Sequence, residues 1–267
     1  MTETFQIDLS DKTIFITGAC GLLGRQYVNA LVALGALVVA SDIDEDALNA
    51  LRQSSDFSEK IDTIVCDVNS EKSVVSAMIQ VRKRHGHLDG LVNNAAATGE
   101  YLMRSGAPFG SFEDYSLKMW ESVIKTNLTG PFLVCREASD LLSKAGGGSI
   151  VNVSSTYGLV GPDHRIYDEM PFNSMVAYAA SKAGVHGLTR WLATYFGRKN
   201  IRVNTLVPGG VQNNHESKFI DRYEERTPLG RMAEPGDLSG MVTFLLSDLS
   251  SYSTGQIFVV DGGWTAI

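Results

Sequence analysis

The stretch Thr17-Gly18-Ala19-Cys20-Gly21-Leu22-Leu23-Gly24 decides the fold that the sequence predicts. It joins a β-branched run at residues 13–17 to residues 22–34, where apolar side chains recur at helical spacing. Glycines in such a turn let backbone N–H groups approach a pyrophosphate, and the N-terminus of the following helix adds a favourable dipole. Because the strand–turn–helix context is the one this motif requires, we predict a dinucleotide site here. Its predicted contacts are Gly18, Gly21, Leu22, Leu23 and Gly24.

Strand-like and helix-like segments alternate along the rest of the chain. Further strands are predicted at 37–41, 61–66, 88–93, 150–154, 202–207 and 256–260, and helices at 44–51, 70–85, 120–144 and 177–196. This alternation predicts an α/β fold, a single doubly wound parallel sheet of the Rossmann type with helices on both faces. Residues 1–267 are therefore interpreted as one domain. Residues 98–110 and 159–173 read as long loops, which often carry function.

Composition excludes several classes of protein. The net charge of −7 argues against a nucleic-acid surface, and no apolar run is long enough for a membrane span. Residues 1–11 lack the basic start and apolar centre of a secretory signal, so we expect a cytoplasmic protein. Cys20, Cys66 and Cys135 form no CxxC pair, and the five histidines form no HExxH motif. We therefore expect neither a disulfide framework nor a protein-bound metal.

Asp42, at the end of the second predicted strand, indicates which dinucleotide binds. A carboxylate there can accept hydrogen bonds from the adenosine ribose hydroxyls and repels a 2′-phosphate. No lysine or arginine stands beside it at Ile43 or Asp44, or in the turn at Ala19 or Cys20, to neutralise such a phosphate. The sequence therefore favours NAD over NADP.

Tyr178 and Lys182 open a predicted helix, four residues apart. That spacing is about one helical turn, so the phenol and the ammonium project from the same face. A neighbouring cation favours the phenolate, and an oxidised nicotinamide adds a second positive charge. The pair is therefore a candidate general base for an alcohol, and a general acid in the reverse direction.

In these motifs and their order, the sequence resembles the classical branch of the short-chain dehydrogenase/reductase family. The matching elements are Thr17-Gly18 and Gly24, Asp67-Val68, Asn93-Asn94-Ala95, Asn127, Ser154-Ser155, Tyr178 with Lys182, Arg202-Val203-Asn204, Pro208-Gly209, Thr254-Gly255 and Val260-Asp261-Gly262-Gly263. They cover nearly the whole chain. The resemblance implies an NAD(H)-dependent oxidoreductase that interconverts a secondary alcohol and a ketone by hydride transfer.

The resemblance also implies roles for individual residues. Ser155, chosen over Ser154 by its spacing from Gly158, would hydrogen-bond the reacting oxygen. Lys182 would hold the nicotinamide ribose and lower the pKa of Tyr178, and Asn127 would hold a proton-relaying water. Further cofactor contacts are implied at Asp67, Val68, Asn94, Ala95, Tyr178, Lys182, Pro208, Gly209, Val211 and Asn213.

The chain departs from the family pattern at several positions. Leu22 stands where the usual TGxxxGxG turn has a glycine, and the resulting GxxGxxG spacing is more like the extended branch. Ala96 replaces the glycine of NNAG, and Asn213 stands where a threonine is frequent. Ser155 and Tyr178 also lie further apart than is usual. We therefore predict an active-site insert near 159–175, and a substrate lid near 211–230 where the family places it.

The predicted substrate residues are mostly polar: Tyr157, His164, Arg165, Asn214 and His215, with Glu100 and Arg104 from the earlier loop. Polar donors and acceptors favour a polar, sugar-like small molecule over a steroid or an acyl chain. The insert and the residues after the sixth strand also resemble the flagellin modification protein A group, which is associated with bacterial surface-sugar biosynthesis.

Two other functions remain open at this point. One is an epimerase or dehydratase that uses bound NAD transiently, which the GxxGxxG spacing favours slightly. The other is a non-catalytic NAD-binding sensor on the same fold. The long predicted helices resemble those through which family members assemble. Apolar residues around Trp191 and Tyr195 are more numerous than one core face requires, so we expect a homodimer or homotetramer.

Overall fold

The computed structural model describes residues 6–99, 111–170 and 173–267. Its centre is a seven-stranded parallel sheet in the order β3-β2-β1-β4-β5-β6-β7, which confirms the predicted fold class. The strands are β1 (Thr13–Thr17), β2 (Leu37–Asp42), β3 (Ile61–Val65), β4 (Gly90–Asn93), β5 (Gly148–Val153), β6 (Ile201–Pro208) and β7 (Ile257–Val260).

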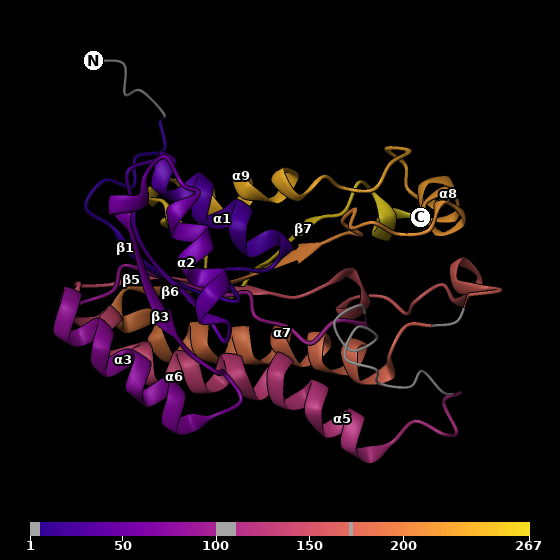
Figure 1. The fold of residues 1–267 in the computed structure, drawn as a ribbon, viewed down its shortest axis with the longest axis horizontal. Coiled ribbons are helices and arrows are strands. Elements are labelled where there is room, and N and C mark those ends of the chain that lie inside the picture. Colours follow the sequence, from indigo (N-terminus) through magenta and orange to yellow (C-terminus); the bar gives the residue numbers. More distant parts are fainter. Residues whose placement is uncertain (1–5, 100–110, 171–172) are drawn as a thin grey trace.

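Helices cover both faces of the sheet (Figure 1). One layer holds α1 (Leu22–Ala33), α2 (Glu45–Gln53) and α9 (Ser239–Leu246), and the other holds α3 (Glu71–His85), α6 (Gly130–Lys144) and α7 (Val176–Phe196). Strand β1 shows how the sequence builds two cores. Ile14 and Ile16 pack on the first side and Phe15 on the second, because successive side chains of a strand point to opposite faces.

The predicted helix over 120–144 is in fact three segments. Helix α5 begins earlier, at Leu117, and ends at Ile124. A π-helical turn, Lys125–Thr129, follows, and only then does α6 begin. The backbone stays helical through the π turn, so the whole stretch reads as one helix, although the extra residue shifts the phase of its apolar positions.

Two further helices were not predicted. Helix α8 (Ser217–Arg226) is mostly charged, and its apolar side chains are confined to Phe219, Ile220 and Tyr223. Helix α9 has an almost unbroken apolar sequence, which periodicity alone does not distinguish from a buried strand. In both segments the helical conformation depends on packing against neighbouring elements more than on a local sequence pattern.

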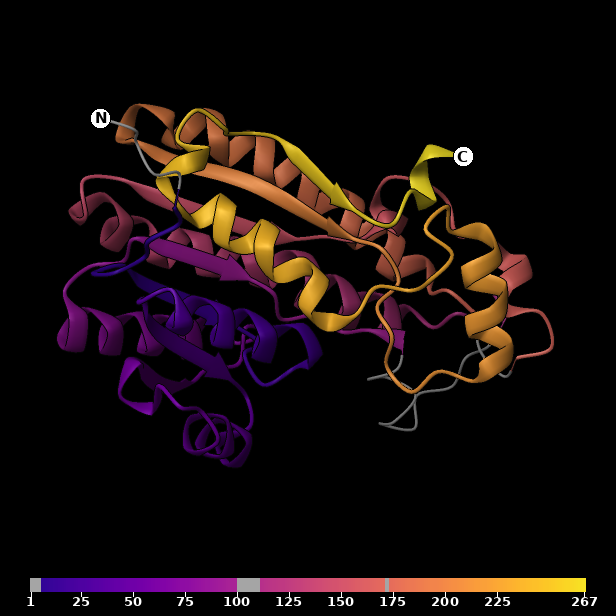
Figure 2. The same ribbon diagram turned by 90° about the horizontal axis from the view of Figure 1, so that it is seen from above.

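The carboxyl ends of the seven parallel strands share one edge of the sheet. Strand order reverses between β1 and β4, which is where an open α/β sheet forms its ligand crevice. Figure 2 shows α8 beyond this edge, past the end of β7. Two short 3₁₀ turns after β5, Thr156–Gly158 and His164–Tyr167, carry the chain through the predicted insert. Within the described residues, no helix is both long and apolar enough to cross a membrane.

Candidate active site

A cavity of about 830 Å³ lies at the carboxyl edge of the sheet. It brings together the glycine-rich turn, the ends of β2, β4, β5 and β6, and the first turn of α7. The predicted site residues that line it are Gly18, Gly21, Leu22, Leu23, Asp42, Asp67, Val68, Asn94, Ala95, Ser155, Tyr157, Tyr178, Lys182, Pro208, Gly209, Val211, Asn213 and His215. One cavity is thus continuous from the glycine-rich turn to the Tyr178–Lys182 pair.

The glycine-rich turn leaves no room for side chains at two of its positions. Gly18 has φ +64°, and a Cβ there would lie 2.7 Å from Cα of Ala95. A Cβ on Gly24 would lie 2.2 Å from the carbonyl oxygen of Gly18. Asn94 fixes the turn to β4 by donating from Nδ2 to the carbonyl oxygens of Thr17 and Gly18, at 3.2 and 2.9 Å. The GxxGxxG spacing therefore produces a tight turn of the kind that dinucleotides require.

Helix α1 begins at Leu22, directly after this turn. The first N–H groups of a helix have no intrahelical acceptor and form a ready anion site. Both Leu22 and Leu23 line the cavity at this point. The cradle and the helix terminus together fit the pyrophosphate of a dinucleotide, so the residues present agree with the cofactor that the sequence predicts.

The carboxylate of Asp42 lies between the glycine-rich turn and β2. Its Oδ2 accepts from the backbone N–H of Cys20 at 3.0 Å, and its Oδ1 accepts from that of Ile43 at 2.8 Å. Oδ1 also accepts from the N–H of Asp44 at 3.4 Å, so Oδ2 is the oxygen that can accept a further hydrogen bond, and the side chain borders the cavity. Asp44, by contrast, caps α2 by accepting from the N–H of Ala47. The two aspartates therefore have separate surroundings: Asp44 caps a helix, and Asp42 lines the cavity, where its binding of a ribose stays a prediction.

Tyr178 and Lys182 lie one turn apart at the start of α7, and both line the cavity. The ammonium nitrogen Nζ of Lys182 is 5.6 Å from the centre of the Tyr178 ring and donates to the carbonyl oxygen of Val153 at 2.8 Å. The lysine is fully enclosed, and this burial lowers its pKa to about 8. A buried cation is thus held beside the phenol by a backbone carbonyl of β5.

The structure separates the roles of the two serines that follow β5. Ser154 is buried, and its hydroxyl donates to the carbonyl oxygen of Lys182 at 2.8 Å, which ties β5 to α7. Ser155 is partly exposed toward the cavity, and its Oγ accepts from the N–H of Tyr157 at 3.2 Å. Because that bond uses only an acceptor lone pair, the Ser155 proton can be donated to a substrate oxygen. This arrangement supports Ser155 as the serine that acts.

Asn127 lies in the π turn and is buried beside, but not in, the cavity lining. Its Oδ1 accepts from the N–H of Ala97 at 2.7 Å, and its Nδ2 donates to the Ala97 carbonyl and to Oγ of Ser181, each at 3.2 Å. Asn127 therefore joins the segment after β4 to α7. A proton-relaying water at Asn127 stays a prediction.

Three of the predicted substrate residues lie away from the cavity lining. His164 is exposed and bonds to Oδ1 of Asn173 at 2.8 Å. Arg165 has 82% of its side chain exposed and pairs with Asp163 at 2.7 Å. Asn214 is exposed, with φ +52°. Glu100 and Arg104, also named from the sequence, lie outside the described residues.

The substrate end of the cavity is walled by side chains that the sequence analysis did not select: Tyr167, Met175, Phe219, Tyr223 and Met232. Phe219 and Tyr223 lie four residues apart on α8, which is a helical signal for one apolar face. This spacing was not recognised in the sequence because most residues of the segment are charged. The wall is consequently more aromatic than the predicted polar pocket.

Helix α8 and the insert are held together by charges. Lys218 pairs with Glu169, Arg222 donates to the carbonyl of Asp168, and Arg226 lies 3.4 Å from Asp163. A hydrogen bond from Arg165 lowers the pKa of the Asp163 carboxyl, and burial raises it. The hydrogen bond has the larger effect, so this pKa falls to about 2. Its negative charge is therefore present throughout the physiological range.

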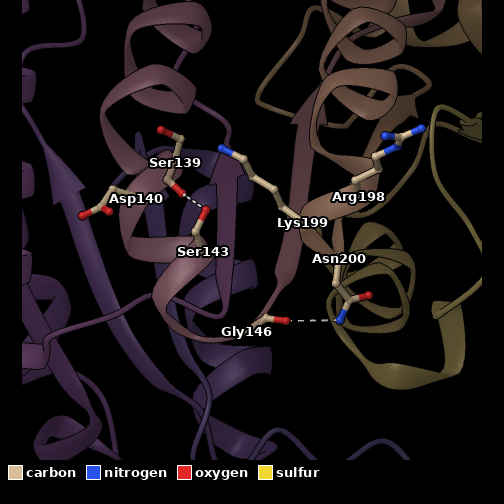
Figure 3. Close-up of a pocket in the computed structure, with 7 residues that line it drawn as sticks. All are labelled: Ser139, Asp140, Ser143, Gly146, Arg198, Lys199 and Asn200. Carbon is tan, nitrogen blue, oxygen red and sulfur yellow. Dashed lines mark hydrogen bonds between the residues drawn. The ribbon is translucent and has the colours of Figure 1, made fainter.

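A second hollow, of about 550 Å³, lies at the amino ends of β5 and β6 (Figure 3). In that view α6 contributes Ser139, Asp140 and Ser143 opposite Lys199, and Asn200 donates to the carbonyl of Gly146 at 3.3 Å. Its charged side chains are exposed to solvent, and it is at the other edge of the sheet from Tyr178. We assign it no chemical role. Over residues 6–99, 111–170 and 173–267, no group of three His, Cys, Asp or Glu is arranged to hold a metal.

Comparison with known proteins identifies the family of this chain. A family model described as enoyl-(acyl carrier protein) reductase matches residues 18–265. The chain is 31% identical to the post-translational flagellin modification protein A of Campylobacter coli, over 96% of this chain and 99% of that protein. It is 37% identical to a trans-4-hydroxycyclohexanecarboxylate dehydrogenase of Sinomonas cyclohexanicum, over 97% of this chain and 94% of that one. The chain belongs to the short-chain dehydrogenase/reductase family, and it is an oxidoreductase that acts on CH–OH donors.

Solved structures extend the likeness to three dimensions. A short-chain dehydrogenase from Leptospira borgpetersenii with bound NAD+ is 34% identical and superposes with a TM-score of 0.86, covering 99% of this chain and 97% of that one. Another solved structure of similar fold holds NADP. The fold thus binds a nicotinamide cofactor, and the choice between the two forms depends on residues of this chain.

Proposed function

We propose that this protein is an NAD(H)-dependent dehydrogenase that interconverts a secondary alcohol and a ketone on a polar, hydroxylated ring, sugar-like in character. The observation that carries the proposal is the continuous cavity from the glycine-rich turn and Asp42 to Ser155, Tyr178 and Lys182. We further propose that one domain spanning residues 1–267 binds both the cofactor and the substrate. In it, the insert near 159–175 and a lid near 211–230 form the substrate wall.

The chain's own residues account for the proton chemistry. The hydroxyl of Ser155 donates a hydrogen bond to the reacting oxygen, and Tyr178 accepts the alcohol proton as the carbonyl forms. Lys182 supplies positive charge beside the phenol and is positioned by Val153. Bound NAD+ supplies the hydride acceptor, so alcohol and NAD+ give ketone, NADH and one proton. Candidate cofactor contacts are the turn residues with Asp42, Asp67, Val68, Asn94, Ala95, Pro208, Gly209, Val211 and Asn213.

A ring is favoured because the substrate wall combines flat aromatic faces with hydroxyl groups. Tyr167, Phe219 and Tyr223 present rings at one end of the cavity, and such faces suit the C–H surfaces of a six-membered ring. Relatives named for cyclohexane-type alcohols, including a 2,5-dichloro-2,5-cyclohexadiene-1,4-diol dehydrogenase, support the same class. We test it by NADH absorbance with cyclic diols, cyclitols and sugars, and with a steroid alcohol and an open-chain hydroxyacyl thioester for contrast.

The same assay separates this function from its rivals. A dehydrogenase accumulates NADH with substrate, whereas an epimerase or dehydratase converts substrate without net NADH. A non-catalytic NAD sensor does neither. Turnover of the steroid or the thioester in preference to every ring polyol would contradict the proposed substrate class while leaving the dehydrogenase activity in place.

We expect this protein to use NAD much better than NADP, and Asp42→Ala to narrow that difference. The carboxylate repels the extra phosphate of NADP, and it is held at the turn by the N–H groups of Cys20 and Ile43. The ratio of kcat/KM for the two cofactors measures the effect. Asp44→Ala is the matched control, because that residue caps α2 instead. A wild-type preference for NADP would refute the assignment.

We also propose that the chain forms a homodimer or homotetramer through α6 and α7. Trp191 and Tyr195 on α7 are 61% and 57% exposed, with their rings stacked at 5.0 Å, and Phe132 on α6 is 45% exposed. Leu192 and Phe196 on the same helix face the core. Light scattering should give a dimer or larger, and Trp191→Glu should reduce the mass, whereas Tyr252→Glu should not. A wild-type monomer at micromolar concentration would contradict this proposal.

A further inference from the structure

Two tyrosines meet at the substrate end of the cavity. The hydroxyl oxygens of Tyr157, just after β5, and Tyr167, in the insert, lie 2.8 Å apart, and both side chains line the cavity. The ring of Tyr167 also packs on Phe219 of α8, with centroids 5.6 Å apart. The pair therefore stands where the strand end, the insert and α8 meet.

Both phenols stay protonated at ordinary pH. Burial raises the pKa of Tyr167 to about 12 and raises that of Tyr157 further. A negative charge on Tyr178, which lines the same cavity, raises both pKa values further. Unlike Tyr178, these two hydroxyls thus act as neutral hydrogen-bonding groups.

The hydrogen bond between the two hydroxyls can run in either direction. When Tyr167 donates to Tyr157, the proton of Tyr157 can be given to an acceptor in the cavity. When Tyr157 donates to Tyr167, a lone pair of Tyr157 can accept a proton from a donor. Such a site suits an uncharged group, and a hydroxyl, which is both donor and acceptor, is satisfied in either direction of the bond.

We propose that the Tyr157–Tyr167 pair binds a second hydroxyl of the substrate, on the carbon next to the one that is oxidised. This inference rests on the proposed function and narrows its substrate class to rings that carry a vicinal diol. The adjacent position follows from geometry at Ser155, which hydrogen-bonds the first hydroxyl in the proposed mechanism: its Oγ accepts from the N–H of Tyr157 at 3.2 Å, and both residues line the same cavity as Tyr178. The two tyrosines are then specificity residues, and the reaction itself stays with Ser155, Tyr178 and Lys182.

A purely structural role is the competing explanation, with the pair serving only to attach the insert. The insert already has other attachments, through Lys218 with Glu169, Arg222 with Asp168, and Arg226 with Asp163. Replacing a tyrosine by phenylalanine removes one hydroxyl and keeps the ring, including the Tyr167 ring that packs on Phe219. Tyr157→Phe and Tyr167→Phe therefore probe hydrogen bonding at the site, with little change in the shape of the wall.

The test compares 1,2-cyclohexanediol, 1,4-cyclohexanediol and cyclohexanol with NAD. Wild-type kcat/KM should favour the 1,2-diol over cyclohexanol by about tenfold or more, with the 1,4-diol close to cyclohexanol. Tyr157→Phe should lower kcat/KM for the 1,2-diol by about tenfold and leave cyclohexanol within about threefold. Tyr167→Phe should act in the same direction. Tyr252→Phe, a fully exposed phenol, is the control and should change neither.

The outcomes separate the two proposals. If neither these alcohols nor the other ring polyols yield NADH, the proposed function fails and this inference fails with it. If ring alcohols are oxidised but the 1,2-diol has no advantage, or if Tyr157→Phe slows all three alcohols equally, the inference is wrong and the proposed function stands. Should Tyr157→Phe not fold, judged by its melting temperature, Tyr167→Phe and the wild-type substrate ratios decide the matter.

Discussion

Replacing Tyr178 by phenylalanine is expected to lower turnover by at least about 100-fold while NAD binding stays within a few-fold of wild type. In the proposed mechanism the phenol, at the first turn of α7, accepts the proton, and general acid–base catalysis is typically worth about 10² to 10⁴ in rate. The phenylalanine ring keeps the packing against the buried cluster of Ala97, Val123, Met175 and Ala177. Single-turnover NADH formation measures the chemistry, and protein fluorescence measures cofactor binding.

The matched control for this variant lies on the same helix. Tyr195→Phe removes a phenol hydroxyl from an exposed side chain of α7, remote from the cavity, and should leave turnover unchanged. If Tyr178→Phe retained near-normal turnover, the proton would have to leave by another group and the mechanism would be overturned. If NAD binding were lost as well, the loss of activity would carry no information about proton transfer, and the Ser155→Ala variant would be measured in its place.

Replacing Lys182 by methionine should stabilise the protein while lowering turnover by about 100-fold or more. Burial lowers the pKa of Lys182 to about 8, so the protein carries a buried ammonium at neutral pH that folding disfavours. The lowering of the pKa from the ordinary value of 10.5 corresponds to roughly 3 kcal/mol of unfolding free energy that the wild type loses at neutral pH. The variant avoids this loss but gives up the hydrogen bond to Val153, which costs it about 1 kcal/mol. We expect a melting temperature higher by a few degrees at pH 7.

The pH dependence gives this prediction a specific sign. Between pH 8 and 10.5 the unfolded chain holds the Lys182 proton more tightly than the folded one, so wild-type stability gains with rising pH from this group. Below pH 8 the full free-energy cost of burying the Lys182 ammonium is present. The advantage of Lys182→Met should therefore be largest near pH 7 and shrink toward pH 10. A variant clearly less stable than wild type at pH 7 would mean that the ammonium is held by favourable partners.

The sheet, and the placement of Tyr178 and Lys182 together at the candidate site, could be predicted because their signals are local. The turn from Gly18 to Gly24 is a contiguous motif with a steric reason for each glycine, and Tyr178 and Lys182 are one helical turn apart. The buried strands can be recognised in the sequence as short apolar runs between helices. Asp42 could be assigned for the same reason, since its position at the end of β2 follows from the strand itself.

The substrate wall could not be predicted, because it is made by packing between segments far apart in sequence. Charged residues of the insert were expected to reach the ligand, yet Arg165 pairs with Asp163 two residues away. The residues that do line the cavity are aromatic, such as Phe219, which lies in a segment that reads as hydrophilic. Tyr157 was named from the sequence, but its partner Tyr167 becomes apparent only when the insert folds back onto β5.

The π turn at Lys125–Thr129 sets the rotational phase between α5 and α6. One extra residue turns everything before it by about 100° relative to an unbroken α-helix. With that offset, Val123 of α5 meets Met175 and Ala177, while Val134 and Leu141 of α6 meet the sheet. The π turn therefore lets one nearly continuous helix pack against α7 through its first part and against the sheet through its second. The first turn of α7, with Tyr178, is supported by the α5 contact.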